Sequence, residues 1–549
     1  MQGYFLQNYD PAGNIWLSAL VAALPIFVFL LSLVALKLKG YVAAFLTVAA
    51  SAGVAVLFYK MPVSAAFASF AYGFLYGLWP IAWIILCAIF LYKLSVNSGY
   101  FETLKTSITI ISPDHRIQVI LIAFCFGSFL EGAIGFGAPV AISAALLMGL
   151  GLKPLSAAGL SMVANTAGAA FGAVGIPITA LAGTVNLDPT IISTMTARML
   201  PPITFLVPFF LAFLVGGKFK DVLPHVTVAA ASYTITQYAT AKFLGPELVN
   251  ITSAIVSIVL LSASVRIWKI KNIFRLGGAQ DSERNLEPPH LSAGQILKAW
   301  LPFGFVIAAI VVWNLDAFKS AMSFADIKFE VPNLHNVVVQ SAPISEGEQA
   351  IAAVYSWGVI KATGTAILLA VVLTILALRV KFSIVLAPAK QAGKEMSLPI
   401  VTIGLIVAYA YIAKYSGQAA TMGLALSSTG NAFGFFSPII GWLGVFLTGS
   451  VTSANLLFGT LQQVTANQLG VHEVIFLAAN TVGGVVGKII SPQSIAVACA
   501  AVGMAGRESE VLKFTLKYSL IFIVLASAIT WLVIHVFPQL VPVVTDFIK

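Results

Sequence analysis

Long apolar runs recur along almost the whole chain and constrain its fold more than any other feature. A run of about 20 apolar residues has the length that a helix needs to cross a bilayer core of about 30 Å. Of the 549 residues, 59% are hydrophobic and 9% are charged, a balance that excludes a water-soluble globular protein. The runs occupy 15–36, 40–59, 66–92, 117–150, 155–182, 193–217, 222–265, 294–313, 361–378, 397–413, 432–465, 472–505 and 514–537.

Several of these runs are too long or too rich in glycine to form one simple helix, and 222–265 is long enough for two. We therefore predict an all-α polytopic membrane protein with about 12 to 14 transmembrane helices, some of them broken or re-entrant. The basic residues that give the chain its formal charge of +10 lie at span ends and in loops, where they anchor and orient the spans. The lipid bilayer is thus an expected partner, nucleic acid is not, and no signal indicates an oligomeric state.

The distribution of basic residues predicts the orientation of the chain. Residues 1–14 contain no Lys or Arg, whereas Lys37 and Lys39 follow the first run directly. By the positive-inside rule the N-terminus lies outside. The acidic loop 314–360 is expected on that outer side, and the basic loop Arg266 to Lys298 in the cytoplasm.

An internal repeat divides the chain. Segment 165–177 resembles segment 480–492, and segment 126–138 resembles segment 444–455 when a gap is allowed. The first spans of the two halves run in opposite directions, so we expect inverted repeats at 1–217 and 294–549, joined by a helix pair and a basic loop at 218–293. Inverted repeats with glycine-interrupted segments are typical of secondary transporters, which bind substrate where the broken segments meet. Glycines that only allow close helix packing are the alternative.

Glu131 and Lys488 are the charged residues placed deep in these segments. An ionised carboxylate is costly among apolar residues, which favours proton uptake by Glu131 near neutral pH and hence a proton-coupling role. A structural carboxyl that caps a broken helix is the alternative. Lys488 is the one clearly intramembrane cation of the second repeat, and it suits a single carboxylate of a substrate. Its long side chain could instead reach an interface.

Neutral polar side chains around the two expected breaks supply further donors and acceptors, as a small hydroxylated anion requires. Hydrogen bonds between helices are the alternative for each of them. The chain lacks a phosphate-binding loop and an H-E-x-x-H motif, and its three cysteines have no metal-ligand spacing, so we expect no cofactor, no metal and no catalytic activity. The candidate substrate-binding residues are Lys488, Asn165, Thr166, Asn480, Thr481, Asn455, Ser491 and Gln493.

The strings FLEGAIGFGAPVAISAALL, GIPITALAG, LTGSVTSANLLFG and AANTVGGVVGKIISPQSIA resemble the bacterial L-lactate permease family, and the resemblance covers nearly the whole chain. It implies a symporter of the bacterial cytoplasmic membrane that takes up L-lactate, and often D-lactate and glycolate, together with protons. It also implies kinship with inverted-repeat ion transporters that use paired hairpins and Asn-Thr elements.

One departure from the family concerns proton coupling. Members of the family usually read G-S-D-T-S where this chain reads Gly449 to Ser453, so an aspartate is missing at Val451. Coupling then depends on Glu131 alone, uses another ion or is weakened. A sodium-coupled carrier of dicarboxylates or other organic anions and a passive monocarboxylate channel are the alternative functions.

Overall fold

Helices make up most of the computed structural model, which describes residues 4–135, 137–276 and 291–542. Among the described residues, ten helices are long and apolar enough to cross a membrane, or up to twelve if each of two bent helix pairs is one span. The prediction of an all-α polytopic membrane protein is confirmed. The expected number of crossings is met only at its lower limit.

Most helices that precede residue 218 follow the predicted runs closely, whereas α6 lies in none of them and the run 117–150 is divided among α7, α8 and α9. Their bounds are α1 Ile15–Ala22, α2 Leu24–Val34, α3 Gly40–Gly53, α4 Val63–Tyr76, α5 Trp83–Asn97, α6 Tyr100–Thr109, α7 His115–Val119, α8 Gly127–Ala133, α9 Ala138–Gly149, α10 Pro154–Ala164, α11 Gly172–Val185, α12 Pro189–Met199 and α13 Pro201–Val215.

The run 222–265 forms two helices, as its length predicted: α14 (Leu223–Phe243) and α15 (Val249–Ile267), which pack against each other. The remaining helices are α16 Ala293–Asn314, α17 Asp316–Ala321, α18 Thr363–Ala377, α19 Phe382–Ser416, α20 Gln418–Ser427, α21 Phe433–Thr448, α22 Val451–Gln468, α23 Glu473–Lys488, α24 Pro492–Ala501 and α25 Glu508–His535.

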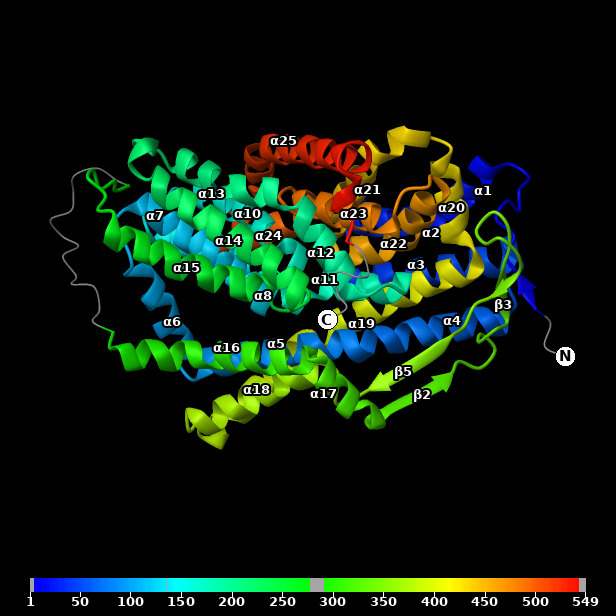
Figure 1. The fold of residues 1–549 in the computed structure, drawn as a ribbon, viewed down its shortest axis with the longest axis horizontal. Coiled ribbons are helices and arrows are strands. Elements are labelled where there is room, and N and C mark those ends of the chain that lie inside the picture. Colours follow the sequence, from blue (N-terminus) through cyan, green and yellow to red (C-terminus); the bar gives the residue numbers. More distant parts are fainter. Residues whose placement is uncertain (1–3, 136, 277–290, 543–549) are drawn as a thin grey trace.

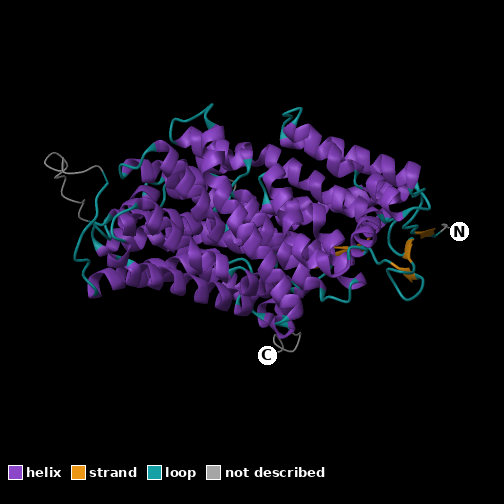
Figure 2. Cartoon of the chain, turned by 90° about the horizontal axis from the view of Figure 1, so that it is seen from above, coloured by secondary structure: helices purple, strands orange, loops and turns teal. Residues whose placement is uncertain are grey.

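One of two small sheets lies at one end of the long axis beside the N-terminus, and the other extends from that half toward the middle (Figures 1 and 2). Strand β1 (Phe5–Leu6) pairs in parallel with β3 (Val338–Gln340), which pairs with β4 (Gln349–Ala350), and β2 (Asp326–Glu330) pairs with β5 (Val354–Gly358). The N-terminus and the acidic loop therefore lie on the same side, as the charge pattern predicted for both.

A buried ion pair holds several loops together at the opposite end of the long axis. Arg116 is fully buried, and its Nη2 lies 2.6 Å from Asp114 Oδ2. Its guanidinium also donates to the carbonyls of Lys218 and Asn272. The basic loop predicted to be cytoplasmic thus meets the segments of Arg116 and Lys218 at one end, although residues 277–290 of this loop lie outside the described residues.

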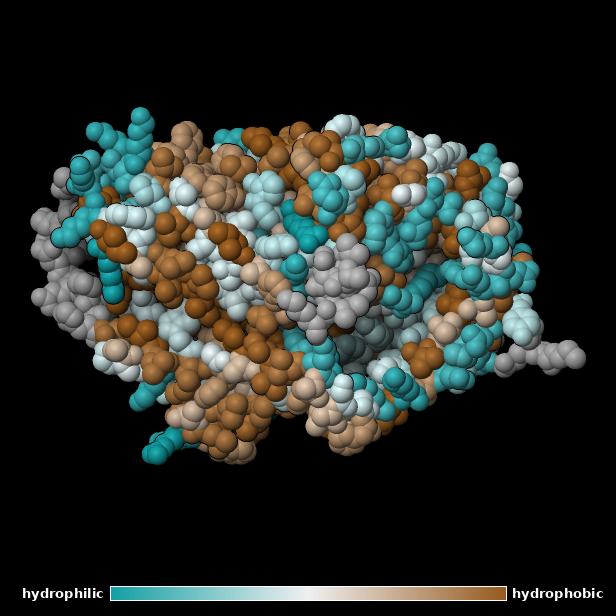
Figure 3. Space-filling view, viewed as in Figure 1, coloured by the Kyte–Doolittle hydropathy of each residue, from teal (hydrophilic) through white to brown (hydrophobic). Residues whose placement is uncertain are grey.

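The surface and the burial of the spans distinguish an outer layer from an inner one. Hydrophobic side chains cover much of the middle of the face shown in Figure 3, whereas hydrophilic ones gather toward the two ends. Among the ten spans, His115–Ala133 is 94% buried and Glu473–Ala501 is 100% buried over their apolar windows, against 33–61% for the others. These two enclosed spans carry Glu131 and Lys488.

Close packing of α21 on α23 depends on glycines. A Cβ added at Gly483 would lie 1.8 Å from the carbonyl oxygen of Pro438, and one added at Gly441 would lie 1.9 Å from that of Asn480. Neither backbone can yield locally, because each is part of a regular helix. The glycines of α23 therefore serve close helix packing, which was the alternative that the sequence left open.

Replacing Gly483 should consequently destabilise the fold. We expect Gly483→Ala to lower the free energy of unfolding by roughly 1–3 kcal/mol, because the added methyl group pushes α21 and α23 apart. The measurement is the thermal unfolding midpoint of the purified protein in detergent. Gly304→Ala is the matched control, since a Cβ there meets no atom within 4 Å. Equal midpoints for the two variants would contradict this account of the packing.

Candidate functional site

A cavity of about 290 Å³ lies between the two most buried spans, His115–Ala133 and Glu473–Ala501, and the α8–α9 and α21–α22 turns. It has room for a small organic anion and some water. Its walls come from the α8–α9 turn, the start of α11, the middle of α19, the α21–α22 turn and the α23–α24 break. The lining residues are Glu131, Gly135, Gly137, Ala169, Gly172, Ala173, Pro177, Met396, Pro399, Gly449, Ser450, Val451, Thr452, Lys488, Gln493, Ser494 and Val497.

An ion pair between Glu131 and Lys488 forms part of this wall. Lys488 Nζ lies 2.6 Å from Glu131 Oε1, and the two residues are 7% and 2% exposed. They come from α23 and α8, which are 357 positions apart in the chain. Two unpaired charges here would be costly, and removing one partner of a buried pair typically costs about 3–5 kcal/mol. The two residues singled out from the sequence are thus one unit.

Asn165 joins this pair. With its amide oriented to satisfy both partners, Asn165 donates to Glu131 Oε2 at 2.9 Å and accepts from Lys488 Nζ at 3.2 Å. The residue lies at the end of α10, where the chain leaves the helix. Gly172 leaves space on the other side of the carboxylate, since an added Cβ would lie 2.7 Å from Glu131 Oε1.

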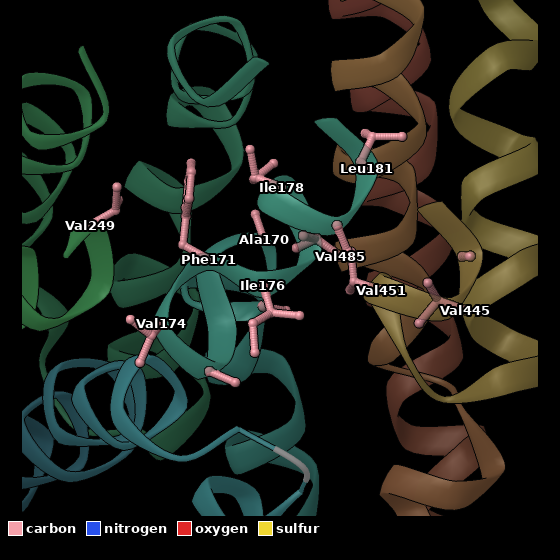
Figure 4. Close-up of a cluster of buried hydrophobic side chains, with 14 of the residues drawn as sticks. Ala170, Phe171, Val174, Ile176, Ile178, Leu181, Val249, Val445, Val451 and Val485 are labelled. Carbon is pink, nitrogen blue, oxygen red and sulfur yellow. The ribbon is translucent and has the colours of Figure 1, made fainter. Parts of the chain in front are cut away.

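The chain between α10 and α11 is broken, as the glycine pattern predicted. Two short 3₁₀ turns, Asn165–Ala167 and Ala169–Phe171, are followed by left-handed backbone at Ala173, Val174 and Gly175. Figure 4 shows this segment between Val249 of α15 on one side and Val451 and Val485 on the other. A break of this kind frees backbone carbonyls, which need donors because they are buried.

Side chains of α14 and α15 supply those donors. Gln237 Nε2 donates to the carbonyl of Ala167 at 3.2 Å, and Asn250 Nδ2 donates to that of Gly168 at 2.6 Å. The Tyr233 hydroxyl lies 3.4 Å from the same carbonyl of Ala167 and 3.3 Å from Asn250 Oδ1, and its one proton is shared between these two acceptors. Sequence reasoning missed these three residues. Their signal was the presence of long polar side chains within the predicted span pair 222–265.

A second polar cluster links the two halves beside the cavity, at the lining residue Pro177. Asn455 Nδ2 donates to the carbonyl of Pro177 at 2.9 Å and to Thr481 Oγ1 at 3.0 Å. Asn480 Nδ2 donates to Asn455 Oδ1 at 2.9 Å, and Gln462 donates to Asn480. The expectation that Asn480 and Thr481 flank a break is wrong, because both lie inside the regular helix α23, which ends only at Lys488.

The other predicted residues occupy different positions around the α23–α24 break and α10. Gln493 lines the cavity and packs against the α21–α22 turn, where Gly449 has a φ of +72°. Ser491 caps α24 by accepting from the backbone N–H of Ser494. The Thr166 hydroxyl donates to the carbonyl of Val163. The structure therefore brings Glu131, Lys488 and Asn165 together, with Gln493 on the same cavity.

The charges of the cavity wall balance one to one. Among the described lining residues, Glu131 is the only carboxylate and Lys488 the only cation. Val451, which replaces the aspartate expected from the family resemblance, lies in this wall at the first turn of α22. The sequence had treated Lys488 as the one intramembrane cation of its half, but Lys414 near the end of α19 is half-buried and donates to the carbonyl of Thr184 at 2.8 Å.

Glu247 is a further buried carboxyl that sequence reasoning missed. It lies in the α14–α15 turn, which packs on the break so closely that a Cβ at Gly175 would lie 2.6 Å from Pro246. Burial raises the pKa of Glu247 to about 7, against smaller opposing effects of its own backbone N–H, Lys319 and Asn314. The charge of Asp188 adds to the increase in this pKa.

Comparison with known proteins identifies similar sequences along the full length. The profile of a family described as L-lactate permease matches residues 18–537. The L-lactate permease of Escherichia coli K12 is 49% identical over 546 residues, covering 98% of this chain and 99% of the relative. The glycolate permease GlcA of the same organism is 46% identical over 549 residues, covering 97% and 98%. The L-lactate permease of Bacillus subtilis 168 is 45% identical over 564 residues, covering 98% and 99%.

Solved structures show a more distant similarity. The YdaH transporter of Alcanivorax borkumensis superposes with a TM-score of 0.46 at 15% identity, over 87% of this chain and 89% of that one. MtrF of Neisseria gonorrhoeae superposes with a TM-score of 0.44 at 12% identity, over 84% and 83%.

The raised pKa of Glu247 predicts a pH-dependent stability. The folded protein retains the proton up to about pH 7, whereas the unfolded chain releases it near the ordinary value of 4.5. The stabilisation is therefore complete below pH 4.5 and is lost as the pH rises to 7, by roughly 3 kcal/mol in total. In thermal unfolding between pH 4.5 and 8, wild type should lose stability relative to Glu247→Gln. The exposed Glu348→Gln is the control, and parallel curves for wild type and Glu247→Gln would contradict the prediction.

Proposed function

This chain belongs to the L-lactate permease family, and from that premise we propose that it is a secondary active transporter, not an enzyme. It imports L-lactate, and D-lactate or glycolate, across the bacterial cytoplasmic membrane by proton symport. The observation that carries this proposal is the buried ion pair of Glu131 and Lys488 in the wall of a cavity. Relatives named as L-lactate and glycolate permeases support the substrate class.

The ion pair couples the proton to the anion by exchange of partners. In the empty cavity, Glu131 and Lys488 neutralise each other. A proton that binds Glu131 removes its charge, and Lys488 then pairs with the carboxylate of lactate. The loaded cavity is again neutral, because the proton compensates the anion. Either ion alone would leave a net charge in a desolvated site, which is costly. One proton therefore moves with each lactate, and no net charge crosses the membrane.

The cavity selects a small hydroxymonocarboxylate. Lys488 holds the carboxylate and Asn165 assists it, while Gln493 and the hydroxyls of Ser450 and Thr452 offer partners for the substrate hydroxyl. A dicarboxylate would bring a second negative charge with no second cation in the described wall. The remaining candidates support the broken segments, since their hydrogen bonds are made within the protein. They are Thr166, Asn480, Thr481, Asn455 and Ser491.

We also propose that residues 1–217 and 294–549 are inverted repeats, with 218–293 between them and the N-terminus outside. Packing supports this division. Helix α11 of the first half packs on α22 of the second, and α24 of the second packs on α9 of the first. In the alignment of the repeats, α9 corresponds to α22 and α11 to α24. Movement of the two halves about this interface alternately opens the cavity to each side.

The first test is uptake of radiolabelled L-lactate into proteoliposomes at fixed sodium and voltage. We expect accumulation only with an inward proton gradient, because the carboxylate can enter the cavity only when Glu131 is protonated. A potassium diffusion potential in place of the proton gradient should drive no accumulation, since loading is neutral. Accumulation driven by an inward sodium gradient, applied in place of the proton gradient, would establish a sodium-coupled carrier. Equilibration without accumulation under any gradient would establish a passive channel.

Substitution of the ion pair separates coupling from binding. Glu131→Gln should abolish proton-driven accumulation and retain lactate exchange, because the neutral amide mimics the protonated carboxyl. Lys488→Met should raise the dissociation constant for lactate at least tenfold, a loss of about 1.4 kcal/mol. Lys513→Met is the control for the loss of a lysine, because Lys513 is an exposed residue of α25.

Because Lys488→Met leaves Glu131 buried without its cation, the double variant Glu131→Gln/Lys488→Met is measured as well, after thermal unfolding shows that it is folded. It should not bind lactate. Full accumulation by Glu131→Gln, or unchanged binding by the folded double variant, would remove the pair from the mechanism.

A further inference from the structure

An apolar groove of about 540 Å³ runs between α6, α15 and α16 on the outer surface. Its walls are Ile255, Ile258 and Val259 of α15 and Ile296 to Ile307 of α16, closed by Ser107 and Ile108 of α6. Both α15 and α16 are apolar enough to span a membrane. The face that carries them in Figure 1 is largely hydrophobic in Figure 3. The groove therefore opens toward the hydrocarbon region.

The groove continues into a second recess of about 430 Å³, which shares Ile258 and Val259 with it and reaches Arg266. No Asp or Glu lines either recess among the described residues. Arg266 is exposed, and so are Trp268, Lys269 and Lys271 that follow it. The apolar groove and the second recess thus end at a cluster of basic residues beside a tryptophan.

We propose that this groove binds an anionic phospholipid of the cytoplasmic leaflet, with one acyl chain between α15 and α16 and the phosphate at Arg266. The basic end lies on the side where Arg116 and Lys218 gather, which the positive-inside rule assigns to the cytoplasm. Basic pockets between transmembrane helices on that side are suited to anionic headgroups. Exposed Trp268 has the amphipathic character of residues at the level of the headgroups.

The floor of the groove suits a hydrocarbon chain better than the side chains of a second protein copy. Its one indole N–H, on Trp300, already donates to Ser107 Oγ at 3.3 Å. Gly304 adds open space, because a Cβ there would meet no atom within 4 Å. An apolar groove with a cation at its end matches the chemistry of one charged lipid.

The groove also adjoins the helix that carries Glu131. Trp300 and Phe303 pack on Phe129 of α8, with ring centroids 5.1 and 4.6 Å apart. A chain seated on Trp300 thus packs against the layer that supports α8. The binding site itself rests on the groove and Arg266, and it does not depend on the transported substrate.

Native mass spectrometry of the purified full chain tests the proposal, with phosphatidylglycerol and phosphatidylcholine of identical acyl chains as probes. Wild type should retain phosphatidylglycerol in preference to phosphatidylcholine, by roughly fivefold. Arg266→Gln should remove this preference, and Lys381→Gln, which removes a charge at the exposed start of α19, should not. Gly304→Leu should lose the retained lipid, because its side chain fills the groove from a Cβ that meets no atom within 4 Å, whereas Gly53→Leu, whose Cβ is equally free, should keep it.

Three results would overturn the proposal: equal retention of both lipids by wild type, unchanged preference in Arg266→Gln, or unchanged lipid retention in Gly304→Leu. A dimer that Gly304→Leu dissociates would likewise overturn it and assign the groove to a second copy of the chain. The thermal unfolding midpoint of each variant is compared with that of wild type. Equal midpoints show that a variant is folded, so that its loss of lipid is not a loss of structure.

Discussion

The ion pair of Glu131 and Lys488 is the interaction on which the rest of the structure depends. Two charges can be held in an apolar interior only when each neutralises the other and other groups satisfy their remaining hydrogen bonds. This requirement accounts for the position of α8 and α23 in the two most enclosed spans. It also accounts for Asn165 bridging both charges and for the space that Gly172 leaves beside the carboxylate.

The two broken segments around this pair are stabilised differently. The first break is long, and its carbonyls accept from Gln237, Asn250 and Tyr233 of the helix pair α14–α15. The second break is short, and Ser491 caps the following helix within its own segment. The helix pair α14–α15, which the sequence presented only as a connection, therefore supports the site. Glu247, in the turn between these two helices, packs against the same break.

The sequence was informative where one residue type has few possible roles. Apolar runs predicted most of the spans within a few residues, although α19 begins at Phe382, well before the predicted run 397–413. The intramembrane charges of Glu131 and Lys488 identified both members of the buried ion pair. Their pairing was not predictable, because they lie in segments 357 positions apart and only tertiary packing brings them together. Asn480 and Thr481 were misplaced for a related reason: glycine can break a helix or allow close packing, and the Gly483 contact with Pro438 is visible only in three dimensions. The polar residues of α14 and α15 carried a signal that became interpretable only once the freed carbonyls were known.

The balance of charge in the cavity connects Val451 to the proposed stoichiometry. With valine in the first turn of α22, the described wall holds one carboxylate and one ammonium group, so the empty cavity is neutral. A carboxylate at this position would leave the empty cavity negative unless it also bound a proton, and each transport cycle would then carry a second titrating group past the same lysine. On the proposed mechanism the side chain at position 451 therefore determines how many protons the cavity holds for one anion. The absence of an aspartate there makes the exchange of partners at Glu131 and Lys488 sufficient for neutral loading, which is the condition for crossing a low-dielectric interior at the smallest electrostatic cost.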